Sequence, residues 1–199
     1  MAGQQYFAER PQAAHRRGEV RVVLPDVVLR LETDSGTFSP GRLDPGTRVL
    51  LDTVPAPPAS GDLLDLGCGY GPVALTMAAR SPGATVWAVD TNERALELCR
   101  SNAARAGLGN VRCITPGEAP PGTRYSVIWS NPPIRIGKPA LHELLTTWLG
   151  LLVPGGAAYL VVHRNLGSDS LQSWLRRRGW AAERVTSRAG YRVLRVETP

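Results

Sequence analysis

The sequence has no long apolar run, and this absence excludes the simplest ways of placing a protein in a membrane. No stretch of about 18 apolar residues occurs in the chain, so no membrane-spanning helix is expected. Residues 1–17 are polar and charged and lack the apolar core of a signal peptide. We therefore expect a cytoplasmic protein that does not bind a membrane.

Cysteine and histidine are scarce, with three of each in the chain. Cys68, Cys99 and Cys113 form no Cys-x-x-Cys pair and have no histidine at the spacing of a zinc site. We expect reduced, mostly buried thiols and no bound metal. Among the histidines only His163, which ends an apolar run, is positioned to face a site, and a capping role explains it equally well.

The remaining composition is that of one globular domain with a basic surface. The chain has 199 residues, of which 43% are hydrophobic, enough for one sizeable core. Lysine and arginine number 23 against 17 acidic residues, and most of the surplus is arginine. Arginine suits phosphate groups, but a basic surface that only keeps the protein in solution accounts for the same surplus. The composition leaves both interpretations open.

Residues 1–60 are predicted to form an arm and a lead-in to the main domain. Two β-rich runs, residues 20–24 and 27–31, predict a hairpin. A short helix can begin at Asp44-Pro45-Gly46, and the proline-rich residues 55–61 form a linker.

From residue 62 onward, strand patterns alternate with helix patterns, which predicts a parallel doubly wound α/β sheet. Because no helix pattern separates the last two strands, they should form an antiparallel pair. The predicted strands are residues 63–66, 85–89, 111–114, 126–129, 157–162, 181–185 and 191–196, and the predicted helices are residues 73–79, 93–106, 141–152 and 170–178.

A glycine-rich loop, Asp65-Leu66-Gly67-Cys68-Gly69-Tyr70-Gly71, follows the first of these strands. Glycines let the backbone turn sharply and approach a ligand closely. The spacing Gly-x-Gly-x-Gly differs from the dinucleotide pattern Gly-x-Gly-x-x-Gly, and the acid disfavours a pyrophosphate. A carboxylate suits a cationic group such as the ammonium of an amino acid. A plain tight turn is the structural alternative.

Asp90 ends the second strand, where an acid can accept hydrogen bonds from both hydroxyls of a ribose. The alternative is that Asp90 caps the helix that begins near Glu93. The glycine-rich loop on the neighbouring strand favours the ribose role.

The most informative stretch is Asn131-Pro132-Pro133-Ile134-Arg135-Ile136-Gly137-Lys138, directly after an apolar strand. Two prolines in succession cannot continue a strand ladder, because each lacks an amide donor. Asn131 therefore stands at the end of the strand beside backbone carbonyls that have no strand partner. Such acceptors suit an NH2 group. An ordinary Asn-Pro turn is the alternative.

The order of these three motifs resembles that of the class I S-adenosylmethionine-dependent methyltransferases. The long form Asn-Pro-Pro-Ile-Arg-x-Gly-Lys is similar to the "methyltransferase small" group, which includes RsmC-like ribosomal RNA guanine-N2 methyltransferases. The resemblance implies a Rossmann-like fold with a seven-stranded, mostly parallel sheet, helices on both faces and an antiparallel last strand. Residues 1–60 would then be a short β/α lead-in packed on a methyltransferase domain of residues 61–199.

The resemblance also implies roles for individual residues. Asp65, Gly67 and Gly69 would hold the methionine part of S-adenosylmethionine, and Asp90 its ribose. The whole implied cofactor set is Phe38, Asp65, Gly67, Cys68, Gly69, Asp90, Thr91, Thr115 and Asn131, and the implied catalytic set is Asn131, Pro132, Pro133 and Ile134. The Asn131 side chain and the Pro132 carbonyl would bind the target amine.

One position departs from the family pattern. Members commonly place an acid near the adenine after the third strand, where this chain has Thr115. Either Glu118 or backbone groups would then hold the adenine.

Basic residues near the motif are candidates for contacts with nucleic acid. We expect Arg135, Lys138 and Arg164 to bind RNA phosphates. The run of arginines at 176–178 has two interpretations, either phosphate contacts or a solvated helix end that suits the helix dipole.

The sequence thus predicts an enzyme that uses S-adenosylmethionine, releases S-adenosylhomocysteine, and methylates N2 of a guanine in RNA, most of all small-subunit ribosomal RNA. One alternative is a protein-glutamine or DNA-adenine N-methyltransferase, which Ile134 disfavours because those enzymes carry an aromatic residue there. Another is a non-catalytic RNA-binding protein with the same fold. The sequence leaves open whether the protein is a monomer or a homodimer.

Overall fold

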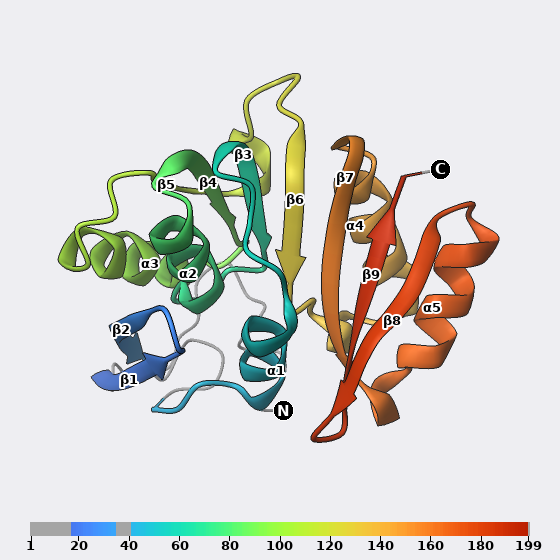
Figure 1. Cartoon of the computed structure of the whole chain (residues 1–199), viewed down its shortest axis with the longest axis horizontal. Coiled ribbons are helices and arrows are strands. Elements are labelled where there is room, and N and C mark those ends of the chain that lie inside the picture. The colour runs from blue at the N-terminus through green and yellow to red at the C-terminus, as the bar shows by residue number, and fades with distance from the viewer. Residues whose placement is uncertain (1–16, 35–40, 199) are drawn as a thin grey trace.

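The computed structural model of the chain describes residues 17–34 and 41–198 (Figure 1). Seven strands form one sheet in the order β5-β4-β3-β6-β7-β9-β8. β3 is parallel to both of its neighbours, β4 and β6, whereas β9 is antiparallel to β7 and β8. The strands are β3 (Ser60–Leu66), β4 (Gly83–Val89), β5 (Val111–Ile114), β6 (Tyr125–Ser130), β7 (Leu152–His163), β8 (Ala181–Arg188) and β9 (Tyr191–Glu197). The predicted sheet and its antiparallel end are confirmed.

Helices cover both faces of the sheet. Successive side chains of each strand point to opposite faces, so each apolar strand contributes to a core on either side. Leu63 faces the core formed with α1, α2 and α3, and Leu64 faces the core formed with α4 and α5. The helices are α1 (Pro45–Thr53), α2 (Pro72–Arg80), α3 (Glu93–Arg105), α4 (Lys138–Leu149) and α5 (Ser168–Arg177). The described residues also contain short 3₁₀ helices, which are η2 (Pro116–Glu118), η3 (Ile134–Ile136) and η4 (Arg164–Leu166).

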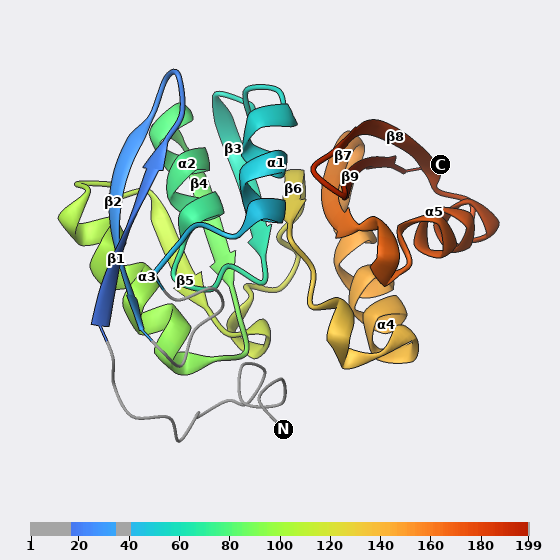
Figure 2. The ribbon, with the colours of Figure 1, turned by 90° about the horizontal axis from the view of Figure 1, so that it is seen from below.

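The predicted hairpin forms a separate two-stranded sheet of β1 (Arg17–Val23) and β2 (Val28–Asp34), which lies beside α3 (Figure 2). Polar contacts attach it to the main domain. The buried Asn102 side chain of α3 accepts from the Glu32 N–H at 2.8 Å and donates to the Glu32 carbonyl at 3.0 Å. Asp26 and Arg80 form a two-pronged ion pair.

The structure differs from the prediction around the third of the four helices predicted after residue 62. The predicted helix 141–152 is α4, which begins at Lys138 and ends at Leu149, before Gly150. A proline in the first turn is tolerated because the first N–H groups of a helix have no partner within the helix. β7 begins at Leu152, earlier than the predicted strand 157–162, and a register shift between Tyr125 and Val127 of β6 accommodates the Pro154-Gly155-Gly156 segment.

Candidate functional site

The sheet brings the ends of three strands to one place. In the register of the sheet, Leu66 of β3 pairs with Val89 of β4 on one side and with Ser130 of β6 on the other. The residues that follow these three strands therefore emerge at the same level. Chain order reverses between β3 and β6, which is the switch point where open α/β sheets bind ligands. Asn131, which follows β6, therefore lies across this point from the glycine-rich loop that follows β3.

The glycine-rich loop has a left-handed backbone at Gly67, Gly69 and Gly71, with φ of 80°, 55° and 100°. Gly71 also lacks room for a side chain, because an added Cβ would lie 2.6 Å from Leu75 Cδ1 and 2.7 Å from Cys99 Sγ. Gly69, in contrast, has no atom within 4 Å of such a Cβ. The tight turn thus needs Gly71 for packing, while Gly69 leaves the backbone open toward the cavity.

Asp65 lies at the bottom of the site with 1% of its surface exposed. Its Oδ2 accepts a hydrogen bond from the Ala74 N–H in the first turn of α2 at 2.8 Å. Burial raises the pKa of Asp65 to about 8, and the nearby Asp90 raises it further in the same direction. A cationic ligand group beside this carboxyl would favour its charged form, so the residue suits an ammonium.

Asp90 is not the cap of α3. The side chain of Asn92 takes that role by accepting from the N–H groups of Arg94 and Ala95. Asp90 Oδ2 accepts instead from the Gly69 N–H at 2.9 Å, and Oδ1 accepts from the Asn92 N–H at 2.9 Å. Burial raises the pKa of Asp90. Each carboxylate oxygen can accept one further hydrogen bond, so the group joins the glycine-rich loop to β4 and still offers acceptors.

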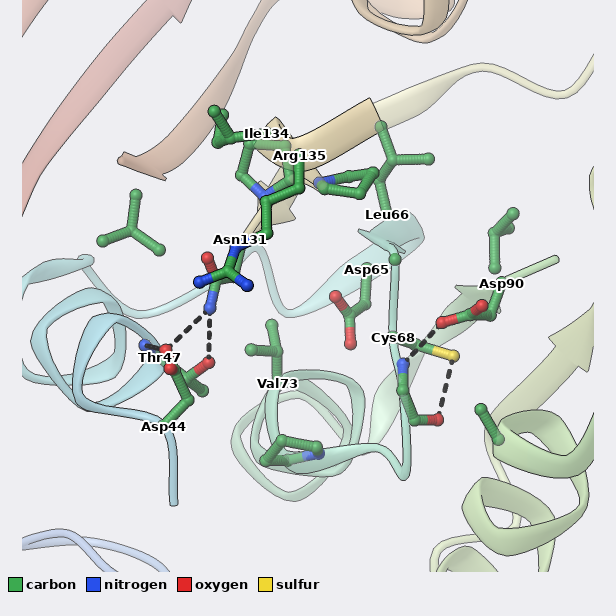
Figure 3. Close-up of a pocket in the computed structure, with 18 of the residues that line it drawn as sticks. Asp44, Thr47, Asp65, Leu66, Cys68, Val73, Asp90, Asn131, Ile134 and Arg135 are labelled. Carbon is green, nitrogen blue, oxygen red and sulfur yellow. Dashed lines mark hydrogen bonds between the residues drawn. The ribbon is translucent and has the colours of Figure 1, made fainter. Parts of the chain in front are cut away.

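Asn131 is held from the opposite side by two residues that we did not predict (Figure 3). Its Nδ2 donates to Asp44 Oδ1 at 2.8 Å and to Thr47 Oγ1 at 3.1 Å. Because a carboxylate can only accept, this contact fixes which end of the amide is the NH2 group. The amide oxygen of Asn131 is thereby left as an acceptor at the end of β6.

The same Asp44 oxygen begins helix α1. It accepts from the Thr47 N–H at 2.9 Å as the N-cap, with Pro45 in the first turn. We attributed Asp44-Pro45-Gly46 to a helix start, which is correct, but the capping pattern gave no sign of a second partner. That partner lies 87 residues further along the chain.

The two prolines end β6 and turn the chain sharply. Pro133 has φ of −74° and ψ of 71°, and the Ile134 N–H donates to the Pro132 carbonyl at 2.8 Å. This geometry is an inverse γ-turn. The Pro132 carbonyl therefore has one partner already and keeps one lone pair for another donor. η3 follows and continues into α4.

These residues line one cavity of about 620 Å³. The predicted residues in its lining are Asp65, Gly67, Cys68, Gly69, Asp90, Thr91, Asn131, Pro132, Pro133, Ile134 and Arg135. Lys138 and Arg164 lie outside the lining, each within a few residues of it. Phe38 lies outside the described residues.

Thr115 is not among the residues that line the cavity. Its hydroxyl and N–H both bond to Glu118 Oε2, at 2.9 and 2.7 Å, and form a capping box for η2. Glu118 is therefore turned toward Thr115, and the hydrogen bonds lower its pKa. Pro116, between the two, contributes to the lining instead.

One wall of the cavity comes from the carboxyl-terminal part of the chain. Of its residues, we predicted only His163 from the sequence. Tyr191 of β9 lies edge-on to His163, with ring centroids 4.9 Å apart. His163 Nδ1 accepts from the Asn165 N–H at 3.2 Å and so caps η4. Capping was one of the two roles that we expected for His163. Asn165 and Leu166 complete the wall, and Leu166 is 47% exposed.

The cysteines are free thiols near the glycine-rich loop, and Cys68 and Cys99 are buried. Burial raises the pKa of Cys68 to about 12, so the thiol form dominates. Within residues 17–34 and 41–198, no group of three or more His, Cys, Asp or Glu side chains is arranged to hold a metal ion. In the same ranges no helix is long and apolar enough to cross a bilayer.

Comparison with known proteins identifies relatives over nearly the whole chain. A sequence model of the methyltransferase small domain matches residues 28–195. The uncharacterized protein YbxB of Bacillus subtilis is 29% identical over 195 residues, which cover 96% of this chain and 97% of that protein. Ribosomal RNA small subunit methyltransferase C of Shewanella amazonensis is 30% identical over 163 residues, which cover 80% of this chain.

The chain spans about half the length of the methyltransferase C relatives, with 47% of the Shewanella protein covered. Among solved structures, the 16S rRNA guanine-N2 methyltransferase RsmC of T. thermophilus, in complex with AdoMet and guanosine, superposes with a TM-score of 0.80. The alignment is 22% identical and covers 95% of this chain and 52% of that chain. At this identity the likeness concerns the fold.

Proposed function

Because the chain belongs to the methyltransferase small domain family and is an S-adenosylmethionine-dependent methyltransferase, we propose that it methylates N2 of a guanine in ribosomal RNA. The observation that carries this proposal is the Asn131 amide. Asp44 and Thr47 hold its NH2 end, so that its oxygen is presented as an acceptor to the cavity. A fixed acceptor of this kind suits an exocyclic amine.

The residues of the cavity fit the cofactor. Asp65, buried and with one backbone partner, suits the ammonium of the methionine part. Asp90 keeps free acceptor positions for the ribose hydroxyls, and the open backbone at Gly69 allows close approach. Thr91, Ala95 and Pro116 border the region where we place the adenine. No acidic side chain occupies the position of Thr115, so we assign adenine recognition to backbone and apolar groups there.

When bound, the cofactor supplies an electrophilic methyl group on a sulfonium. The contribution of the protein is to align the amine with it, because such a leaving group needs no acid. The lone pair of the guanine amine is delocalised into the ring. The Asn131 oxygen and the Pro132 carbonyl accept the two amine hydrogens, which favours a pyramidal nitrogen and stabilises the positive charge that develops on it. Ile134 borders the flat base.

Proton loss follows methyl transfer and requires no strong base. If a histidine removed this proton, His163 would be the candidate, since it lines the cavity. Its Nδ1 is engaged as an acceptor by the Asn165 N–H, which leaves Nε2 as the protonated nitrogen. His163 is therefore a cap and a wall residue in this proposal. The target base must be unpaired or flipped out to reach the cavity.

Transfer of a labelled methyl group tests the proposal. The protein is incubated with labelled S-adenosylmethionine and with small subunits, large subunits or naked ribosomal RNA, and the RNA is digested to nucleosides. The expected product is N2-methylguanosine. A protein-glutamine or DNA-adenine enzyme would label a protein or DNA instead. Replacing the mapped guanine by inosine, which lacks the amine, should abolish transfer, and continued transfer to inosine would exclude N2 as the target.

A further inference from the structure

Two helices begin at the rim of the cavity and run away from it along the same face of the sheet (Figure 2). η3 supplies Ile134 and Arg135 to the cavity wall and leads directly into α4. η4 is followed by α5, and its residues Asn165 and Leu166 line the cavity. A nucleotide that enters the cavity between η3 and η4 therefore has α4 and α5 beside its neighbours in the strand.

Aromatic and cationic side chains join the two helices. The His142 ring of α4 stacks on the Trp174 ring of α5, with centroids 3.9 Å apart and planes 6° apart. The guanidinium carbon of Arg178 lies 5.9 Å from the centroid of Trp174. Burial lowers the pKa of His142, and the charges of Lys138, Arg178 and Arg177 lower it further. These cations therefore gather around one stacked pair.

The segments 134–149 and 164–178 contain six lysine and arginine residues and two acids, in a chain whose net charge is +6. One of the acids, Asp169, is paired with Arg192. Arg176 donates to the Ala182 carbonyl at 2.8 Å, which gives it a structural role. The five other cations are exposed, and we call them the α4–α5 cationic surface: Arg135, Lys138, Arg164, Arg177 and Arg178.

A solvated helix end explains only part of this surface. The dipole of α5 favours arginines at its carboxyl end, where Arg177 and Arg178 lie. The same effect disfavours a cation at the amino end of α4, where Lys138, the single lysine of the chain, is the first helical residue. Arg164 likewise precedes the amino end of α5. A polyanionic partner accounts for the cations at both ends.

We propose that the α4–α5 cationic surface binds the RNA phosphates that flank the methylated nucleotide. This inference rests on the proposed function and specifies how the RNA docks. α5 has ten residues and is about 15 Å long, which corresponds to about four steps of a nucleic-acid strand. A base-stacked single strand of RNA, with one base turned into the cavity, matches this arrangement.

Lys138 allows a direct test, because an amine-reactive reagent modifies one lysine side chain in the whole protein. Labelling is followed by mass spectrometry with and without an RNA hairpin that carries an unpaired guanine in its loop. We expect the RNA to slow modification of Lys138 several-fold. S-adenosylhomocysteine alone is the control and should not protect Lys138, which lies outside the cavity lining. Equal labelling with and without saturating RNA would overturn the proposal.

Charge removal provides the second test. In a variant with Lys138→Gln, Arg177→Gln and Arg178→Gln, the slope of log Kd for the fluorescein-labelled hairpin against log salt should decrease by about two. A matched variant removes three exposed arginines elsewhere, through Arg21→Gln, Arg30→Gln and Arg184→Gln, and should keep the slope. Both variants should bind S-adenosylmethionine like the wild type.

The outcomes separate this surface from the function itself. Equal slope changes in the two variants would overturn the assignment of this surface. The assignment would also be overturned if the Lys138, Arg177 and Arg178 variant kept the RNA slope but lost affinity for vesicles of the anionic lipid phosphatidylglycerol. Methyl transfer to RNA by the wild type is measured in parallel. Its absence would overturn the proposed function, whereas an unchanged slope beside intact methyl transfer would overturn only the docking proposal.

Discussion

At the scale of single residues, the site depends on one side chain being oriented by another. Asn131 alone could turn either its oxygen or its NH2 group toward the cavity. The Asp44 carboxylate removes this ambiguity because it binds only the NH2 end, at 2.8 Å. Asp44 is therefore a positioning residue, and it owes its own place to its role as the N-cap of α1.

Two substitutions separate orientation from capping. Serine also caps helices well but is too short to keep the contact with Asn131, so Asp44→Ser should leave the melting temperature nearly unchanged. Methyl transfer should slow by about 10²-fold through misplacement of the amide. Asn131→Ala should slow it by about 10²–10³-fold.

For Asp44→Ser, the informative comparison is between kcat and the Kd for the cofactor. A wild-type kcat in that variant would contradict the positioning role. The conservative variant Asp44→Asn, whose amide oxygen can still accept, should recover part of the rate.

Asp65 should make cofactor binding depend on pH. Its pKa of about 8 keeps the carboxyl protonated in the free protein at neutral pH. A bound ammonium favours the carboxylate, so binding must release a proton, and affinity rises with pH below that pKa. Between about pH 6 and pH 7.5, where an α-ammonium remains charged, the Kd should decrease by up to tenfold per pH unit.

The proton released on cofactor binding is measurable by calorimetry in two buffers of different ionisation enthalpy. Asp65→Asn should bind more weakly and with no pH dependence in this interval. If the wild type binds with no proton release, Asp65 does not face the ammonium.

At the scale of elements, local patterns predicted most of the fold. The strand and helix order after residue 62 follows from alternation and from the turn residues, and β5 (Val111–Ile114) was predicted to the residue. β7 begins earlier than the predicted strand 157–162 because a bulge lets Pro154 lie within the strand, and a bulge depends on the neighbouring strand. The direction of the Thr115 side chain could not be predicted, because its hydrogen bond goes to Glu118, three residues away, and no sequence pattern shows that contact.

Contacts between distant segments were beyond sequence reasoning. The Asn131–Asp44 pair joins residues 87 apart, and each residue had a sufficient local explanation, as a turn or as a cap. Tyr191 enters the site because β9 inserts between β7 and β8. An added Cβ at Gly46 would lie 2.7 Å from Tyr191 Cε1, so α1 and β9 meet at that glycine.

Within the glycine-rich loop, two glycines should respond differently to alanine. Gly71→Ala places a Cβ against Leu75 and Cys99 at a strained φ, and should lower the free energy of unfolding by about 3 kcal/mol. Gly69→Ala meets no neighbour and should cost about 1 kcal/mol for its left-handed backbone. Gly69→Ala should instead weaken cofactor binding, since it fills the open side of the loop.

Urea unfolding and calorimetric titration of both variants check this division. Equal losses of stability in the two variants would contradict the packing role of Gly71. Wild-type cofactor affinity in Gly69→Ala would contradict a close approach of the cofactor to the Gly69 backbone.

At the scale of the whole molecule, Asn102 connects three parts of the chain. Its side chain bonds twice to Glu32 of the hairpin, and its Nδ2 also donates to the Tyr70 carbonyl of the glycine-rich loop at 3.0 Å. We propose on this basis that the lead-in and the main domain unfold as one unit. The cofactor loop is then supported by a hairpin that lies outside the central sheet.

Asn102→Ala should therefore destabilise the entire protein by about 3 kcal/mol, because it leaves buried backbone groups without partners. Tryptophan fluorescence and hydrogen exchange at the β2 amides should show the same decrease. Asn110→Ala is the matched control, since the Asn110 side chain donates to carbonyls between α2 and β4, at Ala78, Ser81 and Ala84. Loss of β2 protection with an unchanged fluorescence midpoint in Asn102→Ala would show instead that the hairpin unfolds alone.

We propose above all that the fixed Asn131 acceptor directs methyl transfer to the amine of guanine. Nucleoside analysis of ribosomal RNA after reaction with labelled S-adenosylmethionine tests it most directly, with wild-type protein and Asn131→Ala side by side. The wild type should yield labelled N2-methylguanosine, and the variant should show a decrease of at least about 10²-fold in that product. A different methylated nucleoside, or an equal yield of N2-methylguanosine from Asn131→Ala, would contradict it.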